Sequence, residues 1–106
     1  MDLNDSADAA LPAWALGPLL TLVTAEANRG LLVDALPLLQ NDPRVDLSGV
    51  RQIDAAGVQL LLSLRATLAE SGQCLALAAP SREVAEALDL LGLGGYFPVR
   101  PAGPAR

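Results

Sequence analysis

The chain has 106 residues, of which 52% are hydrophobic and 18% are charged, and its formal net charge is −5. This length and composition indicate one folded domain, and the acidic balance argues against nucleic acid as a partner. Histidine is absent, which removes the commonest general base and metal ligand, so we expect no catalytic residue, no metal site, no cofactor and no enzymatic activity.

No secretory signal is visible, and no apolar run reaches the ~18 to 20 residues that a membrane-spanning helix needs. We therefore expect a cytoplasmic protein that is not embedded in a membrane. Residues 1–12 are acidic and aperiodic, and the last nine residues contain three prolines and a glycine. The sequence thus predicts a flexible acidic N-terminus over 1–12, a folded domain over 13–97 and a flexible proline-rich tail over 98–106.

The first part of the folded domain predicts two extended pieces, over residues 14–16 and 19–22, followed by a helix over 25–39. Thr24 is the expected N-cap of this helix. Pro37 lies within the helix, and we expect it to kink the last turn or to end the regular helix just before it. One mainly apolar stripe is predicted on the helix, formed by Asn28, Leu31, Leu32, Ala35, Leu36 and Leu39.

The middle of the chain predicts a strand over residues 44–47, a turn at 48–49, and a helix that Asp54 caps and that runs to Ser71. Gly72 is expected to end this helix as its C′ residue. The side chains that are predicted to face the sheet from this helix are Leu61, Leu62 and Leu68.

The last part predicts a strand over residues 74–79, in which Cys74 is a small buried core residue. Ser81 is expected to cap a final helix that ends at Gly92. Strands that alternate with helices in this way indicate an α/β fold with a largely parallel sheet.

Two motifs mark the start of the middle helix, where residues 46–50 read D-L-S-G-V and residues 53–58 read I-D-A-A-G-V. With the pattern around them, over about residues 16–97, they resemble the signature of the STAS domain, which is found in anti-sigma-factor antagonists and in the tails of sulfate transporters. The resemblance implies the STAS-like fold of those antagonists, with a small mostly parallel or mixed β-sheet of about four strands packed with about four helices. It also implies a non-enzymatic protein-interaction module of bacterial signal transduction.

The helix start at Asp54 is the candidate docking surface, because a helix N-terminus at the carboxyl end of a parallel strand exposes unpaired amides. The candidate partner-binding residues are Ser48, Asp54, Ala55, Ala56, Gly57 and Val58. Docking by shape requires the last four of these to be small and exposed. The alternative is that two alanines simply begin a helix well, and Asp54 is an N-cap under either interpretation.

The resemblance also implies that a switch has been lost. In the antagonists, a kinase phosphorylates the second hydroxyl residue of this motif, which falls on Ala56, and the neighbouring hydroxyl falls on Ala55. Neither alanine can accept a phosphoryl group.

Several classes of protein partner stay open under the resemblance. They are an anti-sigma factor or kinase-like ATPase, a chemotaxis-associated complex, and the ATPase of a phospholipid-transporting ABC system, on which the chain would be an accessory subunit. The relatives of that last class usually keep a hydroxyl at the position of Ala55. A nucleotide-binding module is the weakest alternative, because the segment contains no lysine and only Arg51 lies nearby.

A homodimer is a further expectation. The family normally begins with an edge hairpin, but residues 1–12 show no alternating pattern and Pro12 cannot donate to a ladder. We therefore expect an open sheet edge that could pair with a second copy of the chain.

Overall fold

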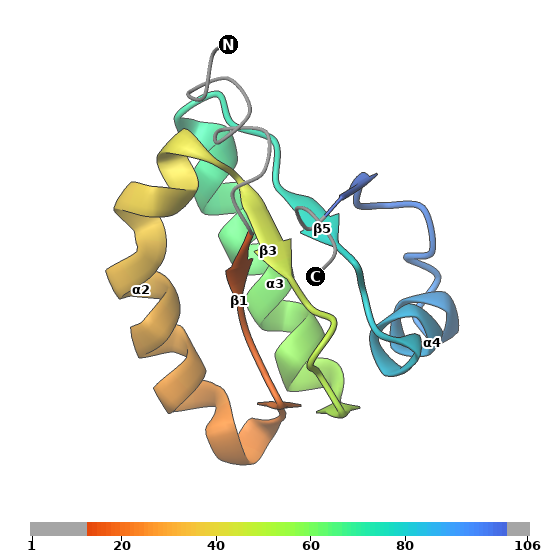
Figure 1. Cartoon of the computed structure of the whole chain (residues 1–106). Coiled ribbons are helices and arrows are strands. Elements are labelled where there is room, and N and C mark those ends of the chain that lie inside the picture. The colour runs from red at the N-terminus through yellow and green to blue at the C-terminus, as the bar shows by residue number, and fades with distance from the viewer. Residues whose placement is uncertain (1–12, 102–106) are drawn as a thin grey trace, which may run out of the picture.

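The computed structural model describes residues 13–101 and shows an α/β fold (Figure 1). The strands are β1 (Trp14–Ala15), β2 (Leu19–Leu20), β3 (Arg44–Asp46), β4 (Gln52–Ile53), β5 (Ala76–Ala78) and β6 (Val99–Arg100). The helices are the short 3₁₀ helix η1 (Leu22–Thr24) and the α-helices α2 (Ala25–Asn41), α3 (Ala55–Glu70) and α4 (Arg82–Leu90). The predicted N-terminal segment 1–12, and residues 102–106 of the predicted tail, lie outside the described residues.

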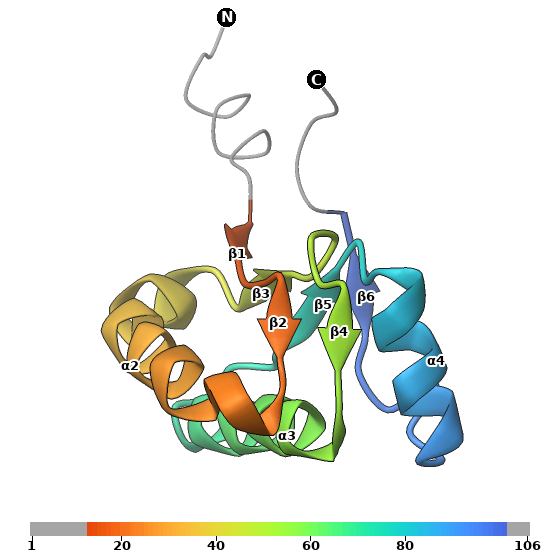
Figure 2. The same cartoon turned by 90° about the horizontal axis from the view of Figure 1, so that it is seen from below.

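The described strands pair in parallel and form a four-stranded and a two-stranded sheet (Figure 2). The two sheets are continuous along the chain, because β2 follows β1 and β4 follows β3. The four-stranded sheet has the order β1-β3-β5-β6, and β2 pairs with β4. Between the ladders, the Leu16 amide donates to the Asp46 carbonyl at 3.1 Å, and the Arg51 amide donates to the Pro18 carbonyl at 2.7 Å. The α/β class and the mostly parallel sheet are confirmed.

Strand β6 corrects the predicted end of the domain. Val99 pairs with Leu77 of β5 and Arg100 pairs with Ala78, although the sequence assigns residues 98–106 to a flexible tail. Proline in this segment does not prevent pairing, because proline lacks only the amide donor, and the Pro98 carbonyl accepts from the Leu77 amide at 2.8 Å. The folded domain therefore extends beyond residue 97.

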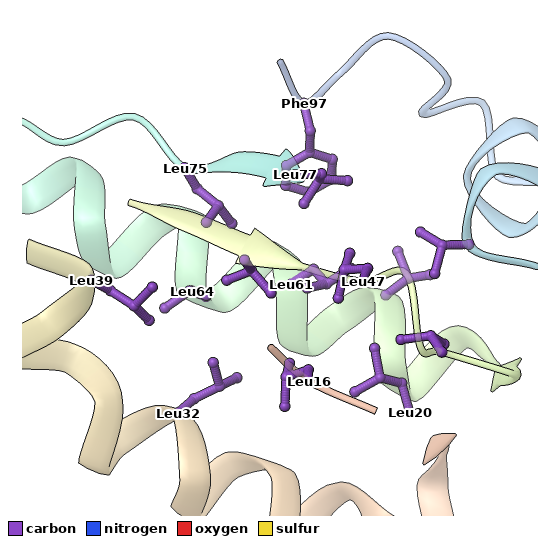
Figure 3. Packing of buried hydrophobic residues seen from close by; sticks show 14 of the residues in the cluster. Leu16, Leu20, Leu32, Leu39, Leu47, Leu61, Leu64, Leu75, Leu77 and Phe97 are labelled. Atoms are coloured by element: carbon purple, nitrogen blue, oxygen red, sulfur yellow. The ribbon is translucent and has the colours of Figure 1, made fainter. Parts of the chain in front are cut away.

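Helices α2 and α3 lie on the same side of the strands and enclose the core with them, while α4 lies beside β4 (Figure 2). Leu61 and Leu68 of α3 are fully buried, as predicted, but Leu62 is only half-buried at the border of the core. Figure 3 shows the converging apolar side chains, which include Leu16, Leu20, Leu32, Leu39, Leu47, Leu61, Leu64, Leu75, Leu77 and Phe97.

Helix α2 buries a narrower stripe than predicted. Its buried side chains are Asn28, Leu32, Ala35 and Leu39. Leu31 is half exposed, so its assignment to the stripe is wrong. Consecutive side chains point about 100° apart around the helix axis, and here Leu32 is the one that faces the core. The helix also continues through Pro37 to Asn41. Pro37 and Val33 are both exposed, and proline leaves the Val33 carbonyl without its intrahelical donor.

The buried Asn28 fixes the segment that precedes α2. Its side-chain amide donates to the Leu19 carbonyl at 2.8 Å and to the Thr24 hydroxyl at 3.0 Å. Thr24 occupies the predicted N-cap position, but its hydroxyl makes no bond to the helix amides and accepts instead from the Thr21 amide at 3.1 Å. These bonds hold η1 against the end of β2.

Glycine closes the C-terminus of α3, as predicted. Gly72 has a φ of 78°, the Gly72 amide donates to the Ala69 carbonyl at 3.0 Å, and the Gln73 amide donates to the Leu68 carbonyl at 2.9 Å. This pair of bonds is the Schellman arrangement. Gly92, with a φ of 74°, follows the end of α4 in the same way.

Cys74 is exposed, so the prediction of a buried core cysteine is wrong. Strand β5 begins only at Ala76, which pairs with Arg44, the first residue of β3. Cys74 precedes this first pair by two residues and therefore lies beyond the end of the sheet, in the connection that leaves α3.

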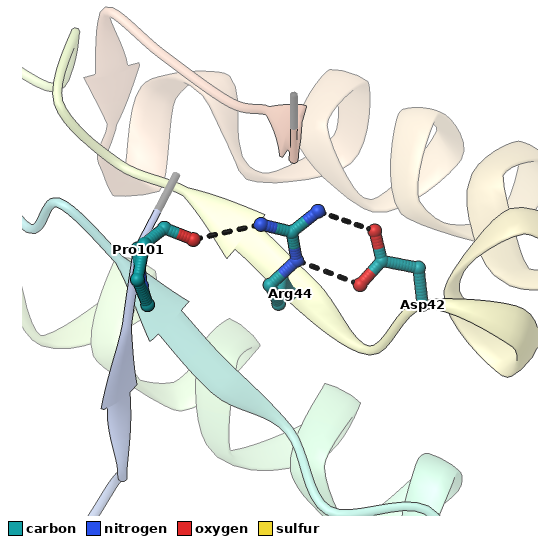
Figure 4. A network of polar contacts seen from close by, with 3 residues as sticks. All are labelled: Asp42, Arg44 and Pro101. Atoms are coloured by element: carbon teal, nitrogen blue, oxygen red, sulfur yellow. Dashed lines mark hydrogen bonds and ion pairs between the residues drawn. The ribbon is translucent and has the colours of Figure 1, made fainter. Parts of the chain in front are cut away.

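Arg44 joins the start of β3 to the C-terminal end of the described chain. Its Nε and Nη2 atoms donate to the two carboxylate oxygens of Asp42 at 2.8 and 2.7 Å, and its Nη1 atom donates to the Pro101 carbonyl at 2.7 Å (Figure 4). A two-point bond between a guanidinium and a carboxylate fixes the orientation of both groups. The arginine therefore braces the segment that contains β6.

Candidate functional site

The start of α3 is organised by the Asp54 carboxylate. Its Oδ1 atom accepts from the amides of Ala56 at 2.9 Å and Gly57 at 3.2 Å, and its Oδ2 atom accepts from the amide of Leu22 at 3.0 Å. Asp54 therefore caps α3, as predicted, and also ties the helix to η1. The hydrogen bond from Leu22, and after it those from Gly57 and Ala56, hold the pKa of the Asp54 carboxyl below its ordinary value.

This cap changes the chemistry expected of the helix start. The prediction of a docking site rests on unpaired amides, but the amides of Ala56 and Gly57 already have an acceptor, and the Val58 amide donates to the Asp54 carbonyl at 3.1 Å. An approaching anion would also meet the negative charge of Asp54. The start of α3 is therefore better suited to contact by side chains than to binding a phosphate.

Gly57 and Val58 lie on the inner side of the first turn, so the expectation that they are exposed is wrong. A Cβ atom on Gly57 would overlap the Leu20 carbonyl oxygen and would lie 2.9 Å from the Leu20 carbonyl carbon. Glycine is needed here because the helix backbone passes directly against β2. Val58 is buried in the core, where a docking partner cannot reach it.

The outer side of the first turn carries Ala55, which is exposed, and Ala56, which is half-buried. Beside them, η1 presents Leu22 with 74% and Val23 with 92% of their surface exposed. The sequence predicts Leu22 at the end of an extended piece and indicates no role for Val23. Neither position belongs to a periodic pattern, so only the tertiary arrangement reveals that these two apolar side chains point to solvent.

Ser48 lies apart from the other candidates. It is exposed in the turn between β3 and β4, and its amide donates to the Asp46 carboxylate at 2.8 Å. Figure 2 shows this turn at the opposite end of β4 from the start of α3. The structure thus brings Asp54, Ala55 and Ala56 together on one surface and leaves Ser48 outside it.

Two surface grooves flank the start of α3. One groove, of about 440 Å³, lies between α2 and α3 and has Ala56 in its lining. The other, of about 580 Å³, lies between η1, β4 and α4 and has Asp54 in its lining. The exposed part of the first turn therefore separates two hollows of the surface.

Within residues 13–101, no group of histidine, cysteine, aspartate or glutamate side chains is arranged to hold a metal ion. In the same range, every buried side-chain nitrogen and oxygen has a hydrogen-bond partner. None of the helices in that range has the length and apolar character that crossing a membrane requires.

Comparison with protein families matches residues 19–101 to a family model described as Mlab, STAS domain. The matched residues run from β2 past β6 and include the whole start of α3 together with the linings of both grooves. No curated protein matches the chain.

Proposed function

Because the chain belongs to the STAS-domain family, whose members are in general interaction modules without enzymatic activity, we propose that it docks onto another protein through the outer side of the α3 start. The proposed docking surface consists of Leu22 and Val23 of η1 and Ala55 and Ala56 of α3, and is called here the α3-start surface. The role of these residues as a binding site is our proposal.

One observation carries the proposal. Two of the most exposed large apolar side chains of the described residues, Leu22 and Val23, stand beside a helix start whose amides are already bonded to Asp54. Such a surface offers methyl and methylene groups with few unpaired polar atoms to desolvate. Apolar contact at such a patch is the usual source of binding energy between proteins.

We propose further that this docking has no phosphorylation switch. Alanine occupies both positions where the antagonists of the family carry hydroxyls, Ala55 and Ala56, so neither can gain the charge that would separate the partners. The Asp54 carboxylate that already caps the helix also disfavours another anion at the same place.

The missing switch bears on the class of partner. It favours an assembly that stays together, such as an accessory subunit on the ATPase of a phospholipid-transporting ABC system or a chemotaxis-associated scaffold, over an anti-sigma factor that must be released. The hydroxyl that the ABC-system relatives usually keep at the position of Ala55 speaks against the first of these. A cytoplasmic location, and a homodimer through an open sheet edge, stay predictions.

The test is one added charge on the α3-start surface. Affinity capture from the native cell extract with mass spectrometry identifies the partner, and calorimetry then measures its binding to the parent, Ala56→Glu and Ala56→Ser. We expect Ala56→Glu to weaken binding at least tenfold, because a carboxylate desolvated without a counter-charge costs several kcal/mol, on the order of 2 to 4. Ala56→Ser adds no charge and should bind nearly as the parent does.

Ala66→Glu is the matched control, because Ala66 is exposed in the C-terminal half of the same helix and outside the docking surface. It should leave the affinity unchanged. Thermal melts should show all three variants folded. Ala66 is exposed, serine at position 56 adds no charge, and the helix dipole offsets the repulsion between a glutamate at position 56 and Asp54. If Ala56→Glu binds as tightly as the parent, the docking surface lies elsewhere on the molecule.

A further inference from the structure

The groove beside η1 has features that contact at the α3-start surface does not use. This η1–α4 groove is lined by residues of η1, β4 and α4. Figure 2 shows β4 between β2 and α4. Each of the three elements contributes apolar side chains to its lining, namely Val23, Ile53, Ala87 and Leu90. Val23 and Leu90, at 92% and 87%, are the most exposed large apolar side chains of residues 13–101. They stand on opposite walls.

The charges along the groove are mainly negative. Its lining holds the carboxylates of Asp54, Glu83 and Glu86 against one guanidinium, that of Arg51. Asp54 is bonded to backbone amides, but among residues 13–101 neither glutamate takes part in an ion pair or a side-chain hydrogen bond. The groove thus combines apolar walls with acidic side chains that have no positive neighbour bonded to them.

The two glutamates lie on one side of α4. They are three positions apart, so they are neighbours on the helix surface, and like charges at such a spacing repel one another. Glu83 lies in the first turn, where a negative charge favours the helix dipole, but Glu86 lies beyond that turn. A cation placed between them would relieve the repulsion.

We propose that the η1–α4 groove binds an amphipathic helix of the partner protein, with apolar side chains on one face flanked by lysine or arginine. The apolar face would lie on Ile53 and Ala87 between the walls at Val23 and Leu90, and the basic side chains would reach Glu83 and Glu86. This is the pattern of helix-in-groove recognition with complementary charge. Anionic partners such as lipid headgroups or nucleic acid are disfavoured by the same carboxylates.

The inference rests on the proposed function, since Val23 belongs to both the groove and the α3-start surface. It adds the chemistry of the partner and extends the contact toward α4. Because Ala56 lies outside the lining of the groove, the two claims can be tested separately.

The probes are two synthetic helical peptides, one of leucine and lysine and one in which glutamate replaces every lysine. Each is titrated into isotope-labelled protein, with amide chemical shifts as the readout. The leucine–lysine peptide should bind, move the signals of Val23, Ile53, Ala87 and Leu90, and bind more weakly as ionic strength rises. The leucine–glutamate peptide should bind at least tenfold more weakly.

Charge reversal in the groove supplies the second arm. Glu83→Lys with Glu86→Lys should weaken binding of the leucine–lysine peptide at least tenfold. The matched control is Asp34→Lys with Glu70→Lys, which changes the net charge equally at exposed positions of α2 and α3. If the double variant folds poorly, Glu86→Lys alone replaces it, because this substitution leaves the first turn of α4 intact. It should produce part of the loss of binding.

Each outcome supports or overturns one claim. Equal binding of both peptides, equal loss in the groove and control variants, or shifts confined to other elements would overturn the groove assignment. If the leucine–lysine peptide misses the groove while Ala56→Glu still weakens binding of the native partner at least tenfold, the proposed function holds and this inference does not. If the peptide occupies the groove but Ala56→Glu binds the native partner as tightly as the parent does, the groove assignment holds and docking through the α3-start surface does not.

Discussion

The two sides of the first turn of α3 have opposite constraints although they are adjacent in sequence. Ala55 and Ala56 face outward beside η1, whereas Gly57 and Val58 face β2 and the core. Ala55 is exposed and Ala56 is half-buried, whereas position 57 is restricted to glycine because no Cβ atom fits there against Leu20. A run of small residues that looks like one docking motif is therefore divided by the helix into a surface and a packing contact.

The largest expected effect comes from a substitution on the inner side of the turn, where Gly57 packs against β2. Gly57→Ala should destabilise the fold by about 4 kcal/mol, above the range typical of overpacking, because the new methyl meets the Leu20 backbone and no side-chain rotation can relieve the overlap. Chemical denaturation followed by circular dichroism measures the change.

Gly30→Ala in α2 is the matched control for this variant. Nothing lies within 4 Å of a Cβ atom at Gly30, and the residue is inside a helix, so alanine should stabilise the protein by roughly 0.5 to 1 kcal/mol. Equal effects of the two substitutions would show that α3 does not approach β2 closely.

The next effect sharpens the boundary of the core along α3. Leu61→Ala should cost about 3 kcal/mol, because Leu61 is fully buried and truncation leaves a cavity beneath the sheet. Leu62→Ala should cost about 1 kcal/mol, because the side chain lies half-buried at the border of the core. Similar losses in urea denaturation, or a larger loss for Leu62→Ala, would mean that the helix is rotated from this orientation.

Features determined by local chemistry could be predicted from the sequence. Asp54 caps the start of α3 with its carboxylate, and Gly72 ends the helix with a left-handed backbone. Each needs only its neighbours in sequence, and aspartate and glycine are typical of these two positions. The parallel sheet could be predicted as well, because the apolar pattern within each element indicates strands that alternate with helices.

Features determined by distant partners could not be predicted in this way. Strand β6 forms because β5 offers it an edge, and the prolines around it concealed that pairing. Residues 74–79 have the composition of an apolar strand, but the register of β5 with β3 leaves Cys74 outside the sheet. Within the candidate site, the exposure of Val23 and the burial of Val58 both depend on how η1 and α3 pack, which no local pattern reports.

The smallest effect concerns the residue that joins the two sides of the turn. One oxygen of Asp54 holds the amides of Ala56 and Gly57, and the other holds the amide of Leu22, which anchors the exposed apolar pair of η1. These bonds lower the pKa of the carboxyl in the folded state. The stabilisation is therefore present above the unfolded value of about 3.9 and is lost as the pH falls through the folded value.

Asp54→Asn tests this role, because asparagine has one acceptor oxygen and no charge, and so cannot serve both sets of amides. At neutral pH the variant should be less stable than the parent. The difference should shrink as the pH falls from about 4 through the lower pKa of the folded parent, where Asp54 loses its charge. Denaturation midpoints across this range give the two profiles. Glu70→Gln is the control: it removes an exposed charge at the other end of α3 and should keep the pH profile of the parent. Parallel profiles for Asp54→Asn and the parent would show that the charge of Asp54 does not hold η1 against the helix.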